Sequence, residues 1–309
     1  MDEVAFTNLD EPLFVGADAT KRDLVDYLAA VADRIIPELR NRPLSVIRVH
    51  RGEAPFMQKN VPRYAPPWVR TVSMWAETSK REVSYALCND RRTLLWFANQ
   101  RAVEYHPSLV RVDRPSAPTH LILDLDPPSA DNFTLVAQVA RLAQQTLADA
   151  GLVGALKTSG AKGLHVFVPI ARAGFDESAA AGRALAARIE RLDPALATTA
   201  FMKEDRHGRV FVDSTRVGGA TVVAAYSPRA RPGVTISFPV AWDDLDRVVP
   251  MDFTVHSAAA LLAKRNPWRD AMPAPQRLPA DLVEEGRAIP VARVQAMHEG
   301  KRRARTRRS

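Results

Sequence analysis

The sequence predicts an α+β protein in which helices flank a central mixed or antiparallel sheet. Two observations lead to this fold class. In the second half of the chain, β-rich apolar runs at 119–125, 164–170 and 209–213 alternate with helical patterns at 132–150 and 175–192. In the first half, a helical pattern precedes a strand, which indicates a separate α/β half. An apolar fraction of 46% is sufficient to build such a core.

The first predicted element is a helix with a capping signature. Thr20 is an N-cap candidate, and Asp23 stands in the capping-box position. Apolar residues then recur at helical spacing as far as Ile35, and we expect Pro37 and Pro43 to end this helical segment. The following predicted elements are a strand at 44–50, an ordered proline-rich and aromatic loop at 55–68, and short strand and helix candidates at 82–87 and 94–97.

The second half has clearer boundaries. Asp131 or Asn132 caps its first helix, and Gly151 ends that helix. A further strand is expected at 221–225, and proline becomes dense from Asn266 onward. We therefore expect a catalytic domain at 1–268, with halves at about 1–115 and 116–268, and a proline-rich extension with a basic tail at 269–309.

Charge and cysteine content narrow the class of protein. The net charge is +8, and six cationic residues lie within 301–308. Such a tail suits a polyanion, because neutralised phosphates release counterions. The alternative is a disordered end that keeps the protein soluble. With one cysteine, no signal-peptide pattern and no apolar run near the ~20 residues of a membrane helix, we expect a soluble cytoplasmic protein.

The run from His120 to Pro128 places Asp124 and Asp126 two residues apart at the end of a predicted strand. Period-2 alternation puts both carboxylates on one face of the strand. Two ionised carboxylates at such a distance repel each other, and a hard cation such as Mg²⁺ or Mn²⁺ relieves the repulsion. Asp-x-Asp is also common at strand ends without any metal, so the pair needs support from other elements.

A small turn that leads into the next strand gives the first support. Gly160 and Gly163 allow backbone N–H groups to approach a phosphate, and Lys162 offers a point charge for a triphosphate. Ser159 and His165 add hydrogen-bond donors. The spacing differs from that of a P-loop, and the turn precedes a strand instead of a helix. A solvated hairpin turn is the alternative interpretation.

Asp213 gives the second support, because it ends another apolar strand in a position similar to that of Asp126. A third acid on a neighbouring strand would complete a three-carboxylate cluster. Such clusters hold two divalent ions that activate an attacking hydroxyl and stabilise a leaving pyrophosphate. A lone aspartate at a strand end is otherwise usually a solvated cap.

The order Asp-x-Asp, Ser-x-x-Lys-x-x-His, Asp resembles that of the archaeo-eukaryotic primase superfamily. Within this superfamily the chain is similar to the polymerase domain of bacterial ligase D, and more closely to stand-alone bacterial primase-polymerases. The similarity extends from about Phe6 to Trp268. It includes the segments Glu104-Tyr105-His106-Pro107, Arg111-Val112-Asp113-Arg114-Pro115 and Ala225-Tyr226-Ser227-Pro228-Arg229.

The resemblance implies a primase-polymerase fold with an RRM-like catalytic half. It also implies templated addition of nucleotides to a primer 3′-hydroxyl, as in gap filling, end joining or excision repair. Mn²⁺ or Mg²⁺ would serve as two divalent cofactors, with ribonucleotides often preferred. The implied metal ligands are Asp124, Asp126 and Asp213. The implied nucleotide-binding residues are Lys59, His106, Ser159, Lys162, Gly163, His165, Arg206 and Arg229.

The implied partners are gapped or primer-template DNA, NTPs or dNTPs, a separate DNA ligase and Ku, in the bacterial cytoplasm at the nucleoid. Lys21 matches one of two family lysines that grip a downstream 5′-phosphate, but Glu11 stands where the other is expected. Ala161 replaces a family glycine, and the segment after Asp213 differs too. These departures and the chain length favour a stand-alone enzyme over a ligase D fragment.

Two other functions remain open from the sequence. One is a metal-dependent phosphotransferase with a nucleophilic first aspartate, although Pro128 stands where such enzymes have Thr or Val. The other is a DNA-binding scaffold with a degenerate site. For DNA contacts, the loop at 55–68 is the best candidate, because Phe56 and Arg63 lie there among other aromatic and basic residues. Core packing is the alternative for such aromatic residues.

Overall fold

The computed structural model describes residues 4–50, 52–76, 80–217, 220–263 and 265–291. The chain forms two compact units, each assembled from three segments of sequence. The first unit comprises residues 1–116, 157–161 and 218–271, and the second comprises 117–156, 162–217 and 272–309. Each unit is described below by itself. The basic segment at 301–308 lies outside the described residues.

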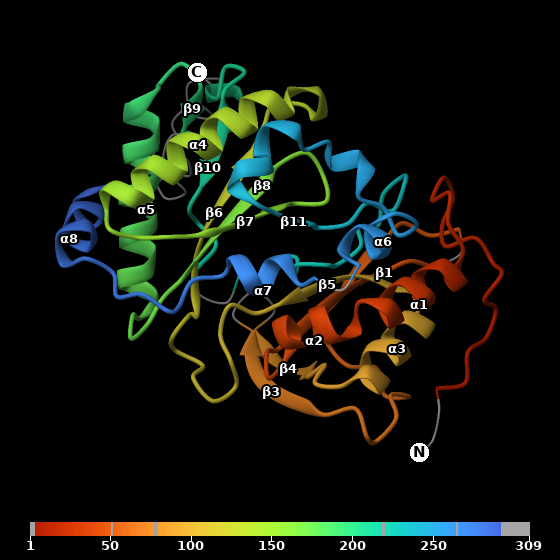
Figure 1. The fold of residues 1–309 in the computed structure, drawn as a ribbon. Helices are drawn as coiled ribbons and strands as arrows, with labels where there is room; N and C mark the ends of the chain where they lie inside the picture. Colours follow the sequence, from red (N-terminus) through yellow and green to blue (C-terminus); the bar gives the residue numbers. More distant parts are fainter. Residues whose placement is uncertain (1–3, 51, 77–79, 218–219, 264, 292–309) are drawn as a thin grey trace, which may run out of the picture. The chain divides into compact units, whose positions relative to one another are not determined.

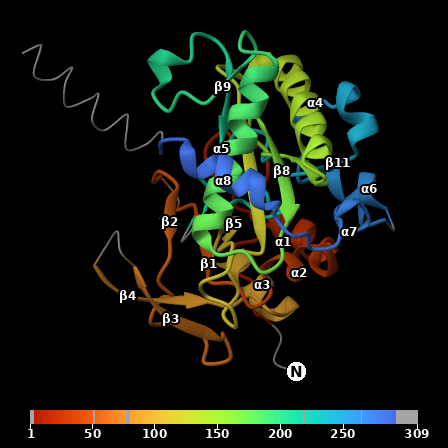
Figure 2. The same ribbon diagram turned by 90° about the vertical axis from the view of Figure 1, so that its left-hand side faces the viewer.

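The first unit is built on a five-stranded sheet with the order β2-β1-β4-β3, in which β5 also pairs with β1 (Figures 1 and 2). Its strands are β1 (Leu44–Arg48), β2 (Phe56–Gln58), β3 (Thr71–Ala76), β4 (Arg81–Ala86) and β5 (Ala102–Pro107). Its longer helices are α1 (Lys21–Ala30), α2 (Ala32–Leu39) and α3 (Arg91–Asn99). The short elements α6 (Ala258–Leu262), α7 (Pro267–Ala271) and β11 (Pro239–Val240) follow later in the chain.

The second unit is built on a sheet in which β8, β6, β10 and β9 are successive neighbours, with β7 next to β8. These strands are β6 (His120–Asp126), β7 (Ala155–Thr158), β8 (Leu164–Pro169), β9 (Ala197–Thr198) and β10 (Val210–Asp213). Its helices are α4 (Phe133–Asp149), α5 (Phe175–Leu192) and α8 (Ala280–Ala288). Helices α4 and α5 contact each other, and both contact β6. The buried faces of these elements are apolar, as the alternating pattern predicted.

The predicted α+β class is confirmed, and most predicted elements form near their expected bounds. The Thr20–Asp23 capping box is present, and Gly151 with a φ of 68° follows the end of α4. Two expectations are wrong. The first helical segment is interrupted at Val31, where α1 ends and α2 begins. Helix α2 then continues through Pro37 to Leu39, because the proline removes only one backbone hydrogen bond.

The second wrong expectation is the strand at 221–225. Thr221 makes one isolated bridge to Ser108, and the chain then turns at Tyr226, whose φ is 69°. The apolar residues of this segment are buried, but as an irregular segment whose Ala224 N–H donates to Tyr105 O at 2.9 Å. The predicted loop at 55–68 contains the short strand β2, and the structure adds β3, β5, β7, β9 and β11.

Helix α8 packs against α5 at very close range, as both ribbon views show (Figure 2). A Cβ atom on Gly286 would lie 1.8 Å from the carbonyl oxygen of Ala180, so glycine is required at this crossing. Arg188 Nε also donates to Glu285 at 2.8 Å. Helix α8 is therefore part of the second unit's packing. No helix among the described residues is both long and apolar enough to cross a membrane.

Candidate active site

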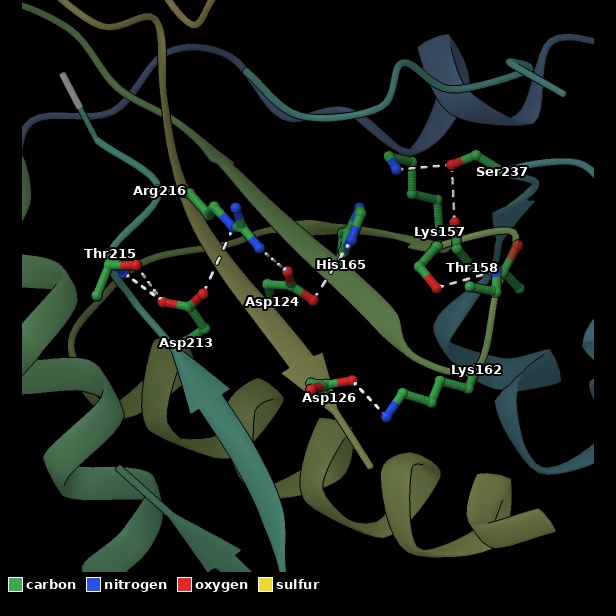
Figure 3. Close-up of polar contacts among 12 residues, drawn as sticks. Asp124, Asp126, Lys157, Thr158, Lys162, His165, Asp213, Thr215, Arg216 and Ser237 are labelled. Atoms are coloured by element: carbon green, nitrogen blue, oxygen red, sulfur yellow. Dashed lines mark hydrogen bonds and ion pairs between the residues drawn. The ribbon is translucent and has the colours of Figure 1, made fainter. Parts of the chain in front are cut away.

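Three carboxylates lie together on two neighbouring strands of the second unit (Figure 3). Asp124 and Asp126 are two residues apart on β6, so their side chains share a face of the sheet. Strand β10 pairs antiparallel with β6 in a register that sets Asp213 directly opposite Asp124. Directly opposed residues have Cβ atoms about 4.5–5.5 Å apart. The register of one strand pair thus collects the three acids.

Arg216 lies between two of these acids. Its Nη2 is 3.2 Å from Asp124 Oδ2, and its Nε is 3.4 Å from Asp213 Oδ2. Thr215 completes the second carboxylate's surroundings, because its N–H and Oγ1 donate to Asp213 Oδ1 at 2.8 and 2.6 Å. One guanidinium therefore neutralises the repulsion between Asp124 and Asp213 across the strand pair.

The turn before β8 supplies two further cationic or polar groups to the same face (Figure 3). Strand pairing sets His165 opposite Asp124, with His165 Nε2 at 3.4 Å from Asp124 Oδ1. Lys162 Nζ lies 3.1 Å from Asp126 Oδ1 and donates to Pro127 O at 2.7 Å. A Cβ atom on Gly163 would fall 2.2 Å from Leu125 O, so the turn passes β6 only because this residue is glycine.

Arg206 is the fourth basic group at this cluster. Its Nη1 is 3.1 Å from Asp126 Oδ2, and its guanidinium carbon lies 3.9 Å from the centre of the Phe211 ring. The neighbouring basic side chains also change the pKa of Asp124. Burial alone would raise the pKa of Asp124, but the charge and hydrogen bond of His165, followed by those of Arg216, lower that pKa to about 2. Asp124 is therefore ionised at neutral pH.

The chemistry of this donor set fits hard divalent cations. Carboxylate oxygens are the ligands that Mg²⁺ and Mn²⁺ prefer, and three of them lie on adjacent strands. Their negative charge is at present matched by Arg216, Lys162, Arg206 and His165, which stand where cations are needed. Among the described residues, no three Asp, Glu, His or Cys side chains already surround a single point closely enough to hold an ion. The three acids are therefore the residues that would hold such an ion.

In the first unit, Glu104, His106 and Arg229 form a second charged cluster. His106 Nε2 is 2.8 Å from Glu104 Oε2, and Arg229 Nε is 3.0 Å from the same oxygen. Burial would raise the pKa of Glu104, but the hydrogen bond from His106 and the charge of Arg229 lower it to about 2. Burial lowers the pKa of His106 below 6.5, and the hydrogen bond to Glu104 only partly opposes this. At pH 7 the glutamate is charged and the histidine neutral.

Arg229 also contacts the turn that carries Ser159. It donates to Ser159 O, and its Cγ would lie 2.7 Å from a Cβ added at Gly160, where φ is +66°. Two further hydrogen bonds that involve Ser237 hold this turn. Lys157 Nζ donates to Ser237 Oγ at 2.7 Å, and Ser237 Oγ donates to Thr158 O at 2.8 Å (Figure 3). The first unit thus holds residues 157–161 rigidly.

The remaining predicted residues also lie in the first unit. Lys59 follows β2 and is exposed, as is Arg63, while Phe56 on β2 is 37% exposed and stacks on His50 at 5.1 Å. Lys21 is buried, and its Nζ donates to Thr7 O at 2.6 Å. Glu11, which stands where the family has a lysine, lies 3.4 Å from Arg101.

Sequence reasoning missed two residues that the structure puts at these clusters. Arg216 lies in the segment after Asp213 that differs from the family pattern, and the sequence assigns it no role. Its position three residues after an acid at a strand end was the signal, because an ion pair is possible at that spacing. Glu104 was quoted within a motif but given no role. Its position two residues before His106 on a strand was the signal, since alternation places both side chains on one face.

A family model described as LigD, primase-polymerase domain, matches residues 20–268. The chain belongs to this family. The LigD protein of Bacillus subtilis, described as a bifunctional non-homologous end joining protein, is 30% identical over 91% of this chain and 46% of its own length. The multifunctional LigD of Mycobacterium tuberculosis is 33% identical over 79% of this chain and 33% of its own length.

The solved polymerase domain of Mycobacterium tuberculosis ligase D, in complex with DNA, superposes with a TM-score of 0.79 at 30% identity. The match covers 88% of this chain and 99% of that one. The chain spans between a third and about half of the length of the curated LigD relatives. It is a nucleotidyltransferase of the primase-polymerase type, from a metal-dependent family. The closer kinship to stand-alone enzymes stays a prediction.

The position of Arg216 leads to a first prediction. Arg216→Ala should destabilise the metal-free protein, because Asp124 and Asp213 lose their shared counter-ion. Added Mn²⁺ should then raise the melting temperature by about 1–2 °C more than in the wild type, the shift that ~1 kcal/mol produces in a chain of this size. Thermal melting with and without Mn²⁺ measures both effects. Arg247→Ala removes an exposed cation paired with Asp244 and is the control. Equal Mn²⁺ shifts in all three proteins would contradict the prediction.

The lowered pKa of Glu104 leads to a second prediction. A carboxyl whose folded pKa of about 2 is below its ordinary value of 4.5 stabilises the fold above pH 4.5. That contribution, about 3 kcal/mol, is lost as the pH falls from 4.5 toward 2. Urea unfolding of the wild type and of Glu104→Gln should therefore show a stability difference that shrinks across this window. A difference independent of pH would show that the charge of Glu104 contributes nothing.

Proposed function

We propose that this chain extends primer 3′-hydroxyl ends at short gaps or breaks in DNA, adding NTPs or dNTPs under the direction of a template strand. The observation that carries the proposal is the cluster on β6, β8 and β10. It combines three carboxylates in register with Lys162 and His165 on the same sheet face. Family membership supports this reaction class, and the DNA bound to the Mycobacterium tuberculosis domain supports the substrate.

Asp124, Asp126 and Asp213 would hold two divalent ions, Mn²⁺ or Mg²⁺. When bound, such ions activate the attacking hydroxyl and stabilise the leaving pyrophosphate. The protein's own residues then have distinct tasks. Lys162, Arg206 and His165, which now neutralise the acids, would turn to the phosphates of the nucleotide. Gly163 would be a further contact to the nucleotide, in a turn that passes close to Leu125 O of β6 because this residue has no side chain.

The family resemblance assigns further nucleotide contacts to Lys59, His106, Ser159 and Arg229. The rigid support of residues 157–161 by Ser237 and Arg229 suits a binding role, because pre-organised donors lose little entropy when substrate binds. A DNA-binding role for Lys21, Phe56 and Arg63 completes the proposal. Phe56 and Arg63 are exposed, whereas Lys21 would have to leave its bond to Thr7.

The cellular setting proposed is repair in the bacterial cytoplasm, at the nucleoid, with a DNA ligase and Ku as partners. The end-joining role named for the LigD relatives supports this setting. Glu11 forms an ion pair with Arg101 and neutralises its charge where the family binds a 5′-phosphate. This pairing favours gap filling over tight binding of a 5′-phosphate. The catalytic residues are proposed to lie within residues 1–268, and α8 beyond them packs against α5 of the second unit.

The test of the proposed reaction is templated extension. A labelled primer annealed across a short gap is incubated with the full chain, Mn²⁺ and NTPs or dNTPs. We expect extension that follows the template sequence, and loss of extension by at least ~100-fold in Asp126→Ala. DNA binding should stay within about twofold, because a lost cation ligand affects chemistry more than phosphate steering.

Asp131→Ala provides the matched control, since Asp131 is an exposed acid near the start of α4 and contacts none of the three acids. Absence of templated extension by the wild type would refute the proposal. Release of phosphate from small phosphoesters without any template would instead favour a phosphotransferase.

The salt dependence of DNA binding tests the first unit's exposed loop. If Lys59 and Arg63 meet phosphates, Lys59→Ala with Arg63→Ala should weaken binding and reduce the slope of log K against log salt by roughly 1–2. Binding of gapped DNA between 50 and 200 mM salt gives the slope. An unchanged slope in the double variant would place the DNA path elsewhere. The exposed pair Arg247 and Asp244 again supplies the control position.

A further inference from the structure

Glu104 is a buried carboxylate whose side chain is only 6% exposed, in the middle of strand β5 of the first unit. Strand alternation places it on the same face as His106, two residues on. The antiparallel pairing of β1 with β5 sets Ile47 opposite Glu104 and Ser45 opposite His106. Neither strand neighbour offers a charge, so the carboxylate must find its partners elsewhere.

Three groups contact the Glu104 carboxylate, and two of them contact the same oxygen. Glu104 Oε2 is 2.8 Å from His106 Nε2 and 3.0 Å from Arg229 Nε. Glu104 Oε1 accepts from the backbone N–H of Ala230 at 2.9 Å. An ionised carboxylate only accepts hydrogen bonds, so Nε2 of His106 must carry the proton. The ring is thereby fixed in one tautomer, and Nδ1 is left as a hydrogen-bond acceptor, which suits a sugar hydroxyl and not a phosphate oxygen.

The backbone around Arg229 is held to β5 as well. Ala224 N–H donates to Tyr105 O, and Tyr105 N–H donates to Ser227 Oγ, both at 2.9 Å. Arg229 N–H donates to Thr235 O at 2.8 Å. The guanidinium that contacts Glu104 also donates to Ser159 O. One carboxylate therefore links His106, Arg229 and, through Arg229, the Ser159 turn.

A purely structural role would not need this arrangement. Burying a carboxylate costs several kcal/mol, and an apolar pair of similar volume is often at least as stable. The partners of Glu104 are two residues that the proposed function assigns to the incoming nucleotide. Fixing the tautomer of one and the direction of the other is what a substrate site needs from its supporting layer.

We propose that Glu104 is a positioning residue of the nucleotide site, which orients His106 toward a sugar hydroxyl and Arg229 toward the phosphates of a nucleoside triphosphate. The inference rests on the proposed function for the identity of the ligand. Its structural content, one carboxylate that sets the His106 tautomer and the Arg229 direction, stands on the contacts alone.

The experiment compares the wild type, Glu104→Gln and the control Asp33→Asn, an exposed carboxylate on α2 outside both clusters. Binding of a fluorescent ATP analogue with Mn²⁺ and binding of gapped DNA are measured for each full-length protein. We expect Glu104→Gln to weaken ATP binding about tenfold, the loss of one hydrogen bond to a charged group. DNA binding should change less than twofold, and Asp33→Asn should match the wild type.

Nitrogen-15 NMR of the histidine rings reports the tautomer directly, with His106→Ala assigning the signal. The wild type should show a protonated Nε2 on His106, and Glu104→Gln should lose that preference. Unchanged ATP binding together with an unchanged tautomer would overturn the proposal.

A double-mutant cycle covers the case in which Glu104→Gln also lowers the melting temperature. If Glu104 acts through His106, its effect on ATP binding should shrink at least about threefold in a His106→Ala background. A merely structural glutamate would cost the same factor in both backgrounds, which would overturn the proposal. Failure of templated extension alone would refute the proposed function and leave the ATP and NMR results to decide the role of Glu104.

Discussion

The antiparallel pairing of β6 with β10 is the constraint on which the active site depends. Its register brings Asp213 opposite Asp124, while strand alternation keeps Asp126 on the same face. Three carboxylates so close together need cations. The protein supplies them from three directions: Arg216 beyond β10, Lys162 and His165 from the turn and strand β8, and Arg206 from the segment before β10. Three side chains with a permanent positive charge, Arg216, Lys162 and Arg206, thus face the three carboxylates.

The first unit shows the reverse arrangement. There a single carboxylate, Glu104, is hydrogen-bonded to His106 and a backbone N–H and forms an ion pair with Arg229. In both clusters a group that would be costly to bury alone is retained because opposite charges meet it. The difference lies in exposure. The side chain of Arg216 is 44% exposed, whereas that of Glu104 is 6% exposed.

The sequence was most informative where local pattern and chemistry coincide. The strand with Asp124 and Asp126, the glycine turn with Lys162, and the strand with Asp213 formed as predicted, because alternation and glycine requirements act over a few residues. Arg216 and Glu104 were not identified because their roles depend on long-range partners. The segment 221–225 has a strand's composition, yet it lies as an irregular segment that bonds to β5. Each unit also collects three separate stretches of chain, which no linear pattern reveals.

The crossing of α8 over α5 bears on how this protein can be divided. The family match ends at residue 268, yet α8 begins at Ala280 and presses Gly286 against the backbone of Ala180. A fragment cut at the family boundary would uncover the small-residue face of α5 and leave Arg188 without Glu285. Newly exposed apolar surface of this kind promotes aggregation. We therefore expect the smallest fragment of this chain that does not aggregate to extend at least to the end of α8.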